Sequence, residues 1–231
     1  MKNHLVLSLL VLSMSLPTWA HAHYVSHQSL DIAQVLPAPP ASGSAEQALD
    51  LQAVLAAQAT RTPAQEKSAL AENDLTVFQF SSVLGPAFNP EHLPATAKLF
   101  KRLQEDAIDV LGPAKDTWKR PRPFLASDAV NPVGGKPGSA SYPSGNSLLG
   151  YVYALVLADL LPAQRDAIFA KGLDIGNARV VAGVHYPSDV AAGRLAAVDI
   201  VAHLSESKAY LADLDTARAE LRTALAGHAL K

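Results

Sequence analysis

The sequence contains no cysteine among its 231 residues, and only 17 % of them are charged. The absence of cysteine excludes a fold held by disulfides, zinc bound by cysteine, and catalysis by a thiolate. Neither sign of charge predominates, because 19 Lys and Arg stand against 21 Asp and Glu, a formal net charge of −2. The chain therefore lacks the overall positive field that would hold a nucleic acid, and any anion must be bound by a local group of cations.

Long hydrophobic runs are also scarce. Beyond the N-terminus the most apolar stretch, Leu148 to Leu161, contains Asp159 and is shorter than the roughly 20 residues that a membrane-spanning helix needs. Membrane insertion is therefore not expected. Apolar residues still make up 49 % of the chain, which excludes a disordered protein and allows one domain, or at most two small ones, with a substantial core.

The first 22 residues have the pattern of a targeting segment. Lys2 precedes an apolar run from Leu5 to Leu16, and Ala20-His21-Ala22 has the small-x-small form of a cleavage site. This pattern predicts a secretory signal peptide over residues 1–22, removed after Ala22. A membrane anchor is the alternative reading, and the apolar run is short for it.

The remaining chain divides into an arm and a helical domain. Residues 23–43 are rich in Pro, Ala and Ser and predict an extended N-terminal arm, followed by a single domain over residues 44–231. Caps and apolar spacings predict helices over about 44–59, 62–72, 100–111, 148–161, 162–185, 188–204 and 210–225. Residues 75–84 fit either helix or strand, and the proline-rich residues 112–145 predict a long loop. No alternating pattern predicts strands, so the expected fold is an all-α, compact multi-helix bundle.

Chemically informative residues interrupt the apolar helices. The proline-rich segment carries Lys115, Lys119, Arg120 and Arg122, which taken singly are typical of solvated surface charges. Ser144 and Gly145 directly precede the buried helix, where backbone N–H groups and the positive end of the helix dipole favour an anion. A serine at this position is also an ordinary helix N-cap.

A third group lies near residue 180. Arg179 stands in an apolar stretch and needs an anionic partner if it is buried, and Asp189 or another structural carboxylate would serve. His185 follows six residues later, and Pro187 separates it from Asp189 by a turn. A single histidine at a helix end is more often a packing residue than a catalytic one.

Taken together, these segments read Lys115-x6-Arg122-Pro123, Pro143-Ser144-Gly145-Asn146 and Ala178-Arg179-x5-His185-x3-Asp189. Their order and spacing resemble the signature of the type 2 phosphatidic acid phosphatase (PAP2) superfamily, written K-x6-R-P, P-S-G-H and S-R-x5-H-x3-D. The chain is most similar to the bacterial class A non-specific acid phosphatases, and the resemblance extends from about Leu36 to about Ala226.

The resemblance implies an all-α fold and an active site without a metal or other cofactor. It implies that the phosphoryl oxygens are held by a group of cations and by a helix N-terminus, namely Lys115, Arg122, Arg179, Ser144 and Gly145. It also implies that His185 is the nucleophile, which forms a phosphohistidine, and that Asp189 orients its ring. Phosphoryl transfer requires mainly positioning and charge stabilisation, which such a group of residues supplies.

One residue departs from the signature in a way that affects chemistry. Asn146 stands where the superfamily has the histidine that protonates the leaving alcohol and then activates water. An amide donates a hydrogen bond but cannot deliver a proton, and loss of general acid–base catalysis costs about 10²–10⁴ in rate. Turnover is therefore expected to be impaired, either in an engineered variant or in a natural member with weakened or altered activity. Ala178 in place of serine is a smaller departure.

These features predict an exported, periplasmic acid phosphatase that acts on small phosphomonoesters, including nucleotides, with phosphotransferase activity as an added capacity. Inorganic phosphate or vanadate is expected to inhibit it, and a homo-oligomer is expected. Two alternatives stay open. The same superfamily pocket holds vanadate in haloperoxidases, and an inactive relative would bind phosphate without turning it over.

Overall fold

A computed structural model describes residues 23–71 and 74–226 of the chain, so the predicted signal peptide lies outside the described residues. Within these ranges the structure is helical and contains no strand, which confirms the expected all-α class. Its elements are α1 (Ala45–Thr60), α2 (Pro63–Ala71), the 3-10 turn η2 (Val77–Phe80), α3 (Ser81–Leu84), α4 (Pro94–Trp118), α5 (Pro123–Ala126), α6 (Gly145–Leu160), η3 (Pro162–Gln164), α7 (Arg165–Val181), α8 (Pro187–Leu204) and α9 (Lys208–Ala226).

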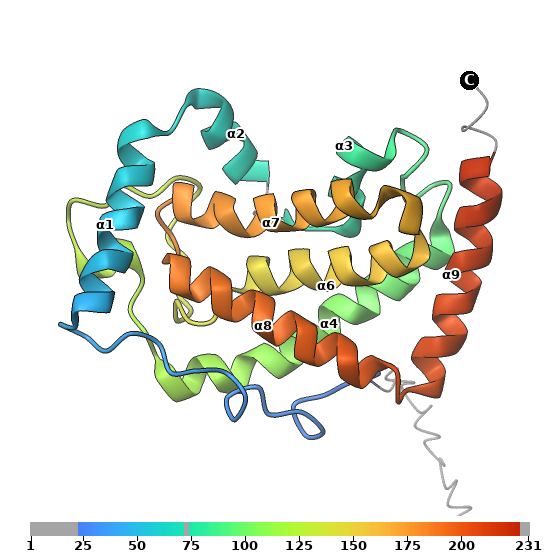
Figure 1. The fold of residues 1–231 in the computed structure, drawn as a ribbon, viewed down its shortest axis with the longest axis horizontal. Helices are drawn as coiled ribbons and strands as arrows, with labels where there is room; N and C mark the ends of the chain where they lie inside the picture. The colour runs from blue at the N-terminus through green and yellow to red at the C-terminus, as the bar shows by residue number, and fades with distance from the viewer. Residues whose placement is uncertain (1–22, 72–73, 227–231) are drawn as a thin grey trace, which may run out of the picture.

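Helix α6 lies at the centre of the bundle, between α7 and α8, with α4 behind and α9 at one end (Figure 1). Its position follows from its composition, because it is apolar around most of its circumference and only a core can bury such a helix. Eleven of its sixteen residues are buried. The N-terminus of this helix carries Ser144 as its cap, and the link between α7 and α8 lies beside it.

Small residues allow the three central helices to approach one another closely. A Cβ atom added to Gly172 of α7 would lie 2.7 Å from the Cβ of Ala154 in α6. A Cβ added to Gly193 of α8 would lie 2.5 Å from the carbonyl oxygen of Ser144. Since real Cβ atoms do not come so close, glycine at these positions sets the distance between the helices and places α8 against the start of α6.

Replacing Gly193 by alanine is expected to lower the free energy of unfolding by about 2–3 kcal/mol, because the new methyl group must displace the Ser144 backbone. Urea unfolding measures this change. Gly138→Ala is the matched control, since a Cβ there meets nothing within 4 Å and its effect should stay within about 0.5 kcal/mol. Equal stability of the two variants would contradict the close packing of α8 against the start of α6.

Two sequence predictions of secondary structure were wrong in extent. Residues 112–145 are not all loop, because α4 continues through Pro113 to Trp118. Gly112 lacks the Cβ that would clash with the following proline ring, and Ala114 continues the buried face of the helix. The helix predicted to end near His185 ends instead at Val181, so His185 lies in the link before α8.

The chain from residue 23 to residue 43 contains turns and bends without helix or strand, and it runs along the lower edge of the bundle in Figure 1. Five of its apolar side chains are buried against the helices: Tyr24, Val25, Leu30, Ile32 and Leu36. The Asp106 carboxylate of α4 fixes its start by accepting hydrogen bonds from the Tyr24 and Val25 N–H groups, at 2.8 and 3.1 Å. The division of the chain into signal peptide, arm and domain stays a prediction.

Among residues 23–71 and 74–226, none of the helices combines the length and the hydrophobicity that crossing a membrane would require.

Candidate active site

Three segments that are far apart in the sequence meet at the N-terminus of α6. The backbone itself joins them, because the Ser144 N–H donates to the Asp189 carbonyl at 3.0 Å and the Ser141 N–H donates to the Arg120 carbonyl at 2.8 Å. The Arg179 carbonyl in turn accepts from the His185 N–H at 3.3 Å. The segment after α4, the start of α6 and the α7–α8 link are therefore held in one fixed arrangement.

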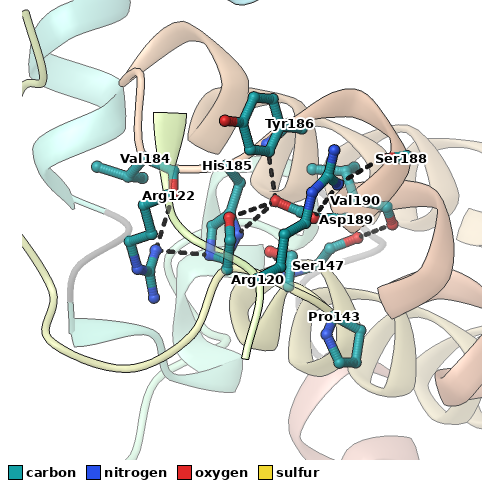
Figure 2. Close-up of polar contacts among 12 residues, drawn as sticks. Arg120, Arg122, Pro143, Ser147, Val184, His185, Tyr186, Ser188, Asp189 and Val190 are labelled. Atoms are coloured by element: carbon teal, nitrogen blue, oxygen red, sulfur yellow. Dashed lines mark hydrogen bonds and ion pairs between the residues drawn. The ribbon is translucent and has the colours of Figure 1, made fainter. Parts of the chain in front are cut away.

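The imidazole of His185 lies between a carboxylate and a guanidinium (Figure 2). Its Nδ1 is 3.3 Å from Oδ2 of Asp189, and its Nε2 is 3.1 Å from Nη1 of Arg122. A guanidinium can only donate, so Nε2 accepts this bond and the ring proton of the neutral form is on Nδ1, facing Asp189. The geometry thus presents the Nε2 lone pair toward the cationic side of the site, as a nucleophile requires.

Asp189 is fully buried, and both oxygens of its carboxylate accept hydrogen bonds. Besides His185, its Oδ2 accepts from the Ser141 hydroxyl at 2.5 Å and from the Tyr186 N–H at 2.8 Å. Its Oδ1 accepts from Nη1 of Arg120 at 2.6 Å. Burial alone would raise the pKa of this carboxyl, but its hydrogen bonds and the nearby positive charge lower the pKa below the ordinary value. The residue is therefore a fixed anion at neutral pH.

The opposite side of the imidazole is positively charged. Arg122 is only 4 % exposed, and it donates to the carbonyls of Ser139 and Val184, each at 2.8 Å, as well as to His185. Burial and the neighbouring Arg179 lower its pKa to about 10, although Asp189 opposes this change. Arg179 is also buried and donates to the Ala69 carbonyl of α2 at 2.9 Å.

Lys115 adds the third cation from the last turn of α4. Its Nζ donates to the carbonyls of Ala140 and Pro143, at 2.6 and 2.8 Å, so it lies against the segment that leads into α6. Burial, reinforced by Arg122, lowers the pKa of Lys115 to about 8. Cations that repel one another in a buried site bind an anion strongly, because the anion relieves the repulsion.

The start of α6 supplies the backbone part of the site. Ser144 is the N-cap, and its hydroxyl oxygen accepts from the Ser147 N–H at 3.4 Å. Gly145 and Asn146 are the first two residues of the helix and are half-buried. A Cβ on Gly145 would come within 3.1 Å of Leu111 in α4, so glycine keeps this end of the helix close to α4. The first turn of any helix has N–H groups that point along the axis and favour an anion.

The site predicts a bell-shaped dependence of kcat/KM on pH. Burial lowers the pKa of His185 to about 4, with Arg122 and Lys115 acting in the same direction and Asp189 opposing them. Only the neutral imidazole has a free lone pair, so activity should rise as pH passes upward through about 4. Lys115 binds an anion only when charged, so activity should fall above about 8.

This profile is measured with rates corrected for titration of the substrate itself. In Lys115→Arg the alkaline limb should move to higher pH, since arginine stays protonated. An acid limb near the ordinary histidine value of about 6.5 would contradict the buried, cation-flanked imidazole.

The structure brings together most of the residues that the sequence singled out, and it shows which cations of the proline-rich segment are buried. Arg120 and Arg122 are buried rather than solvated, while Lys119 is exposed as expected. Two partners of Asp189, Arg120 and Ser141, had no role predicted from the sequence. One feature of the sequence could have indicated Arg120: it lies two residues before Arg122 in the same proline-rich segment. Within the residues described, His, Asp and Glu side chains form no group of three or more that could hold a metal ion.

Comparisons with known proteins place this geometry in a family. The family model of the PAP2 superfamily matches residues 106–210, which contain all three site segments. An acid phosphatase of Zymomonas mobilis subsp. mobilis is 33 % identical over 198 residues, covering 80 % of this chain and 74 % of that protein. A non-specific acid phosphatase of Providencia stuartii is 30 % identical over 202 residues, covering 84 % of this chain and 82 % of that protein.

Solved structures show the same fold at lower identity. A transmembrane PAP2-type phosphatidylglycerolphosphate phosphatase from Bacillus subtilis has a TM-score of 0.51 at 21 % identity, over 77 % of this chain and 92 % of the other. A bacterial vanadium-dependent iodoperoxidase has a TM-score of 0.51 at 17 % identity, over 77 % of this chain and 54 % of the other. The alignments with the two acid phosphatases cover most of this chain and most of each relative. The two solved structures have the same fold as this chain. The chain therefore belongs to the PAP2 superfamily and, within it, to the family of bacterial acid phosphatases.

Proposed function

We propose that this protein hydrolyses small phosphate monoesters, nucleotides included, through a phosphohistidine formed on Nε2 of His185. The observation that carries the proposal is the orientation of the imidazole, whose proton faces Asp189 at 3.3 Å and whose lone pair faces Arg122 at 3.1 Å. A buried neutral imidazole between an anion and a group of cations suits attack on an electrophile that itself carries negative charge.

The reaction takes place in two displacements. The Nε2 lone pair attacks phosphorus, an N–P bond forms, and the P–O bond to the alcohol breaks with its electron pair on oxygen. Asp189 stabilises the imidazolium that develops, in the way the buried carboxylate does in a Ser-His-Asp triad. The departing oxygen takes a proton from solvent and leaves as the alcohol. Water then attacks phosphorus and gives up a proton to solvent, the N–P bond breaks, and phosphate leaves with His185 neutral again. An alcohol in place of water would give phosphotransferase activity.

The cations hold the phosphoryl oxygens during both steps. On binding, Arg122 must exchange its bond to Nε2 for one to a phosphoryl oxygen, which both holds the substrate and exposes the lone pair. Lys115 and Arg179 supply further positive charge, and Ser144 and Gly145 supply the helix N-terminus. Inorganic phosphate and vanadate present the same tetrahedral or pentavalent oxyanion to this site and should inhibit competitively.

The test is release of inorganic phosphate from a panel of monoesters, with and without a metal chelator. We expect hydrolysis of alkyl, aryl and nucleoside monophosphates that the chelator leaves unchanged, because Lys115, Arg122 and Arg179 supply the positive charge. Loss of activity on chelation, or the absence of phosphate release from every ester, would reject the proposal. An assay of halide oxidation in the presence of vanadate tests the alternative of a haloperoxidase, since a vanadium-dependent iodoperoxidase has the same fold.

We propose export to the periplasm on the pattern of residues 1–22, and assembly into a homo-oligomer. Fractionation of expressing cells and N-terminal sequencing of the exported protein test the first, with His23 expected as the first residue. Light scattering of the purified protein tests the second.

A further inference from the structure

Arg120 connects the catalytic carboxylate to a second buried acid on α1. Its Nη1 donates to Oδ1 of Asp189 at 2.6 Å, and its Nη2 donates to Oδ2 of Asp50 at 2.8 Å. The guanidinium lies over the ring of Tyr186, with Cζ 4.1 Å from the ring centroid. All three charged side chains are at least nine-tenths buried, so solvent screens their interactions weakly.

Polar partners hold both ends of this bridge. The Ser188 hydroxyl accepts from Nη1 of Arg120 at 2.7 Å and donates to the Asp50 carboxylate. The Ser188 N–H donates to the other oxygen of Asp50 at 3.2 Å. Gln47, one turn before Asp50 on α1, accepts from Nη2 of Arg120 at 2.5 Å. These contacts fix the guanidinium in one orientation, since its planar fork is engaged on two sides.

The bridge connects alternating charges to the imidazole through successive contacts: Asp50 negative, Arg120 positive, Asp189 negative, then His185. Arg120 anchors one oxygen of Asp189, which leaves the other aimed at Nδ1 of His185 (Figure 2). It also partly offsets the charge that Asp189 presents to the imidazole. Asp50 in turn partly offsets the charge of Arg120. The strength of Asp189 as a partner of the imidazole therefore depends on both residues.

We infer that Arg120 and Asp50 are positioning residues for the reaction at His185, and that α1 acts on the nucleophile through them although neither touches it. This inference rests on the proposed function for its kinetic part. Neither residue lies among the groups expected to hold the phosphoryl oxygens. Their removal should therefore act on the attack by Nε2 and leave substrate binding nearly unchanged.

Replacing Arg120 and replacing Asp50, each by a neutral polar residue, should shift the pKa of His185 in opposite directions. Arg120→Gln removes a cation, which favours the imidazolium, so the pKa of His185 should rise by about half a unit or more. Asp50→Asn removes the anion that offsets Arg120, so the pKa of His185 should fall. The other charged groups around the ring are unchanged in both variants: Asp189 on α8, Lys115 on α4, Arg122 after α4, and Arg179 on α7. NMR of the histidine ring signals measures the titration.

Kinetics supply the second readout. In Arg120→Gln we expect kcat to fall about tenfold or more, while KM and the Kd of inorganic phosphate change less than threefold. Asp50→Asn should lower kcat less, and it should have little further effect in the Arg120→Gln background, because its influence passes through Arg120. Arg120→Lys keeps the charge but cannot engage both acids through a fork, so its kcat should lie between those of the wild type and Arg120→Gln.

Arg102→Gln is the matched control. Arg102 likewise lies over a tyrosine ring, at 3.8 Å from Tyr24, and pairs with a carboxylate, Asp213, at 2.5 Å, but it is on the side of α4 that faces α9. This variant should leave the kcat and the pKa of His185 unchanged. A merely structural role for Arg120 would instead produce loss of stability with no directed change in titration.

The inference is overturned if the two variants shift the pKa of His185 in the same direction or not at all, or if KM and phosphate binding change as much as kcat. Failure of the proposed function is distinguishable from this outcome. It would appear as a wild-type protein without phosphatase activity, in which the opposite shifts of the His185 titration still test the bridge. Should Arg120→Gln fail to fold, Asp50→Asn still tests the expected fall in the pKa of His185, and Arg120→Lys still tests the expected fall in kcat at unchanged KM.

Discussion

Replacing His185 by alanine is expected to abolish hydrolysis of phosphate monoesters, with a fall of at least about 10³-fold in kcat. The reason is that the remaining groups can hold the phosphoryl oxygens but none presents a lone pair in the place of Nε2. Binding of inorganic phosphate should persist within about tenfold, because Lys115, Arg122 and Arg179 are retained. Rates with nitrophenyl phosphate and the Kd of phosphate from calorimetry measure the two effects.

Covalent trapping makes this prediction specific. Rapid acid-free quenching with a labelled monoester should give a phosphoenzyme in the wild type, with the label on His185, and none in His185→Ala. His203→Ala is the matched control, because His203 also faces an aspartate four residues away, Asp199 at 3.7 Å, but lies late in α8. Label on the His185→Ala variant would contradict the assignment of His185 as the nucleophile. Phosphate binding by the wild type without any label would favour the inactive, phosphate-binding alternative.

The second large effect is a gain. Asn146→His is expected to raise kcat on alkyl phosphates by about 10²–10⁴-fold, which corresponds to roughly 3–5 kcal/mol of barrier. Asn146 is the second residue of α6, two residues after the cap Ser144, so a side chain there lies at the helix N-terminus where we propose that the phosphoryl group binds. Histidine at that position can protonate a departing alkoxide and then remove a proton from water, whereas an amide can do neither.

The size of this gain in kcat should depend on the leaving group of the substrate. Nitrophenolate departs without much help from a proton, so nitrophenyl phosphate should gain far less than glycerol phosphate or another alkyl ester. Asn146→Gln is the control, because it changes the side chain but adds no titratable group, and its rates should not rise. Equal rates of wild type and Asn146→His on alkyl esters would show that another group, or solvent, already provides the proton.

The secondary structure could be predicted where its signals are local. The cap at Ser44 and the start at Pro63 mark α1 and α2, and the apolar composition of α6 marks the centre of the bundle. The end of α4 could not be predicted, because Gly112 and Pro113 are typical of a helix stop. Their effect is overridden by burial of Ala114 in the core, which is a property of the fold and not of the segment.

In the candidate site, too, residues were predicted where their own segment indicated them and were missed where only tertiary packing does. The resemblance to the superfamily signature indicated Arg122, Ser144 and His185, and the structure brings their segments together, although their roles stay predictions. Asp50 was not recognised, because it is 70 residues from Arg120 and no pattern near it suggests a buried acid. Partnerships across such separations depend on how helices pack, and burial of Arg120 becomes evident only once α1 lies beside α8.

The bond from Arg122 to Nε2 has a consequence for what this protein can react with. The guanidinium donates a hydrogen bond to the one atom that we propose as nucleophile. A neutral electrophile gives the guanidinium no stronger acceptor, so the lone pair of Nε2 stays in its hydrogen bond to Arg122. An oxyanion draws the guanidinium away by being the better acceptor, so the group that recognises the substrate also unmasks the reactive atom. Selectivity for phosphate would then arise from a competition for one N–H, before any chemistry begins.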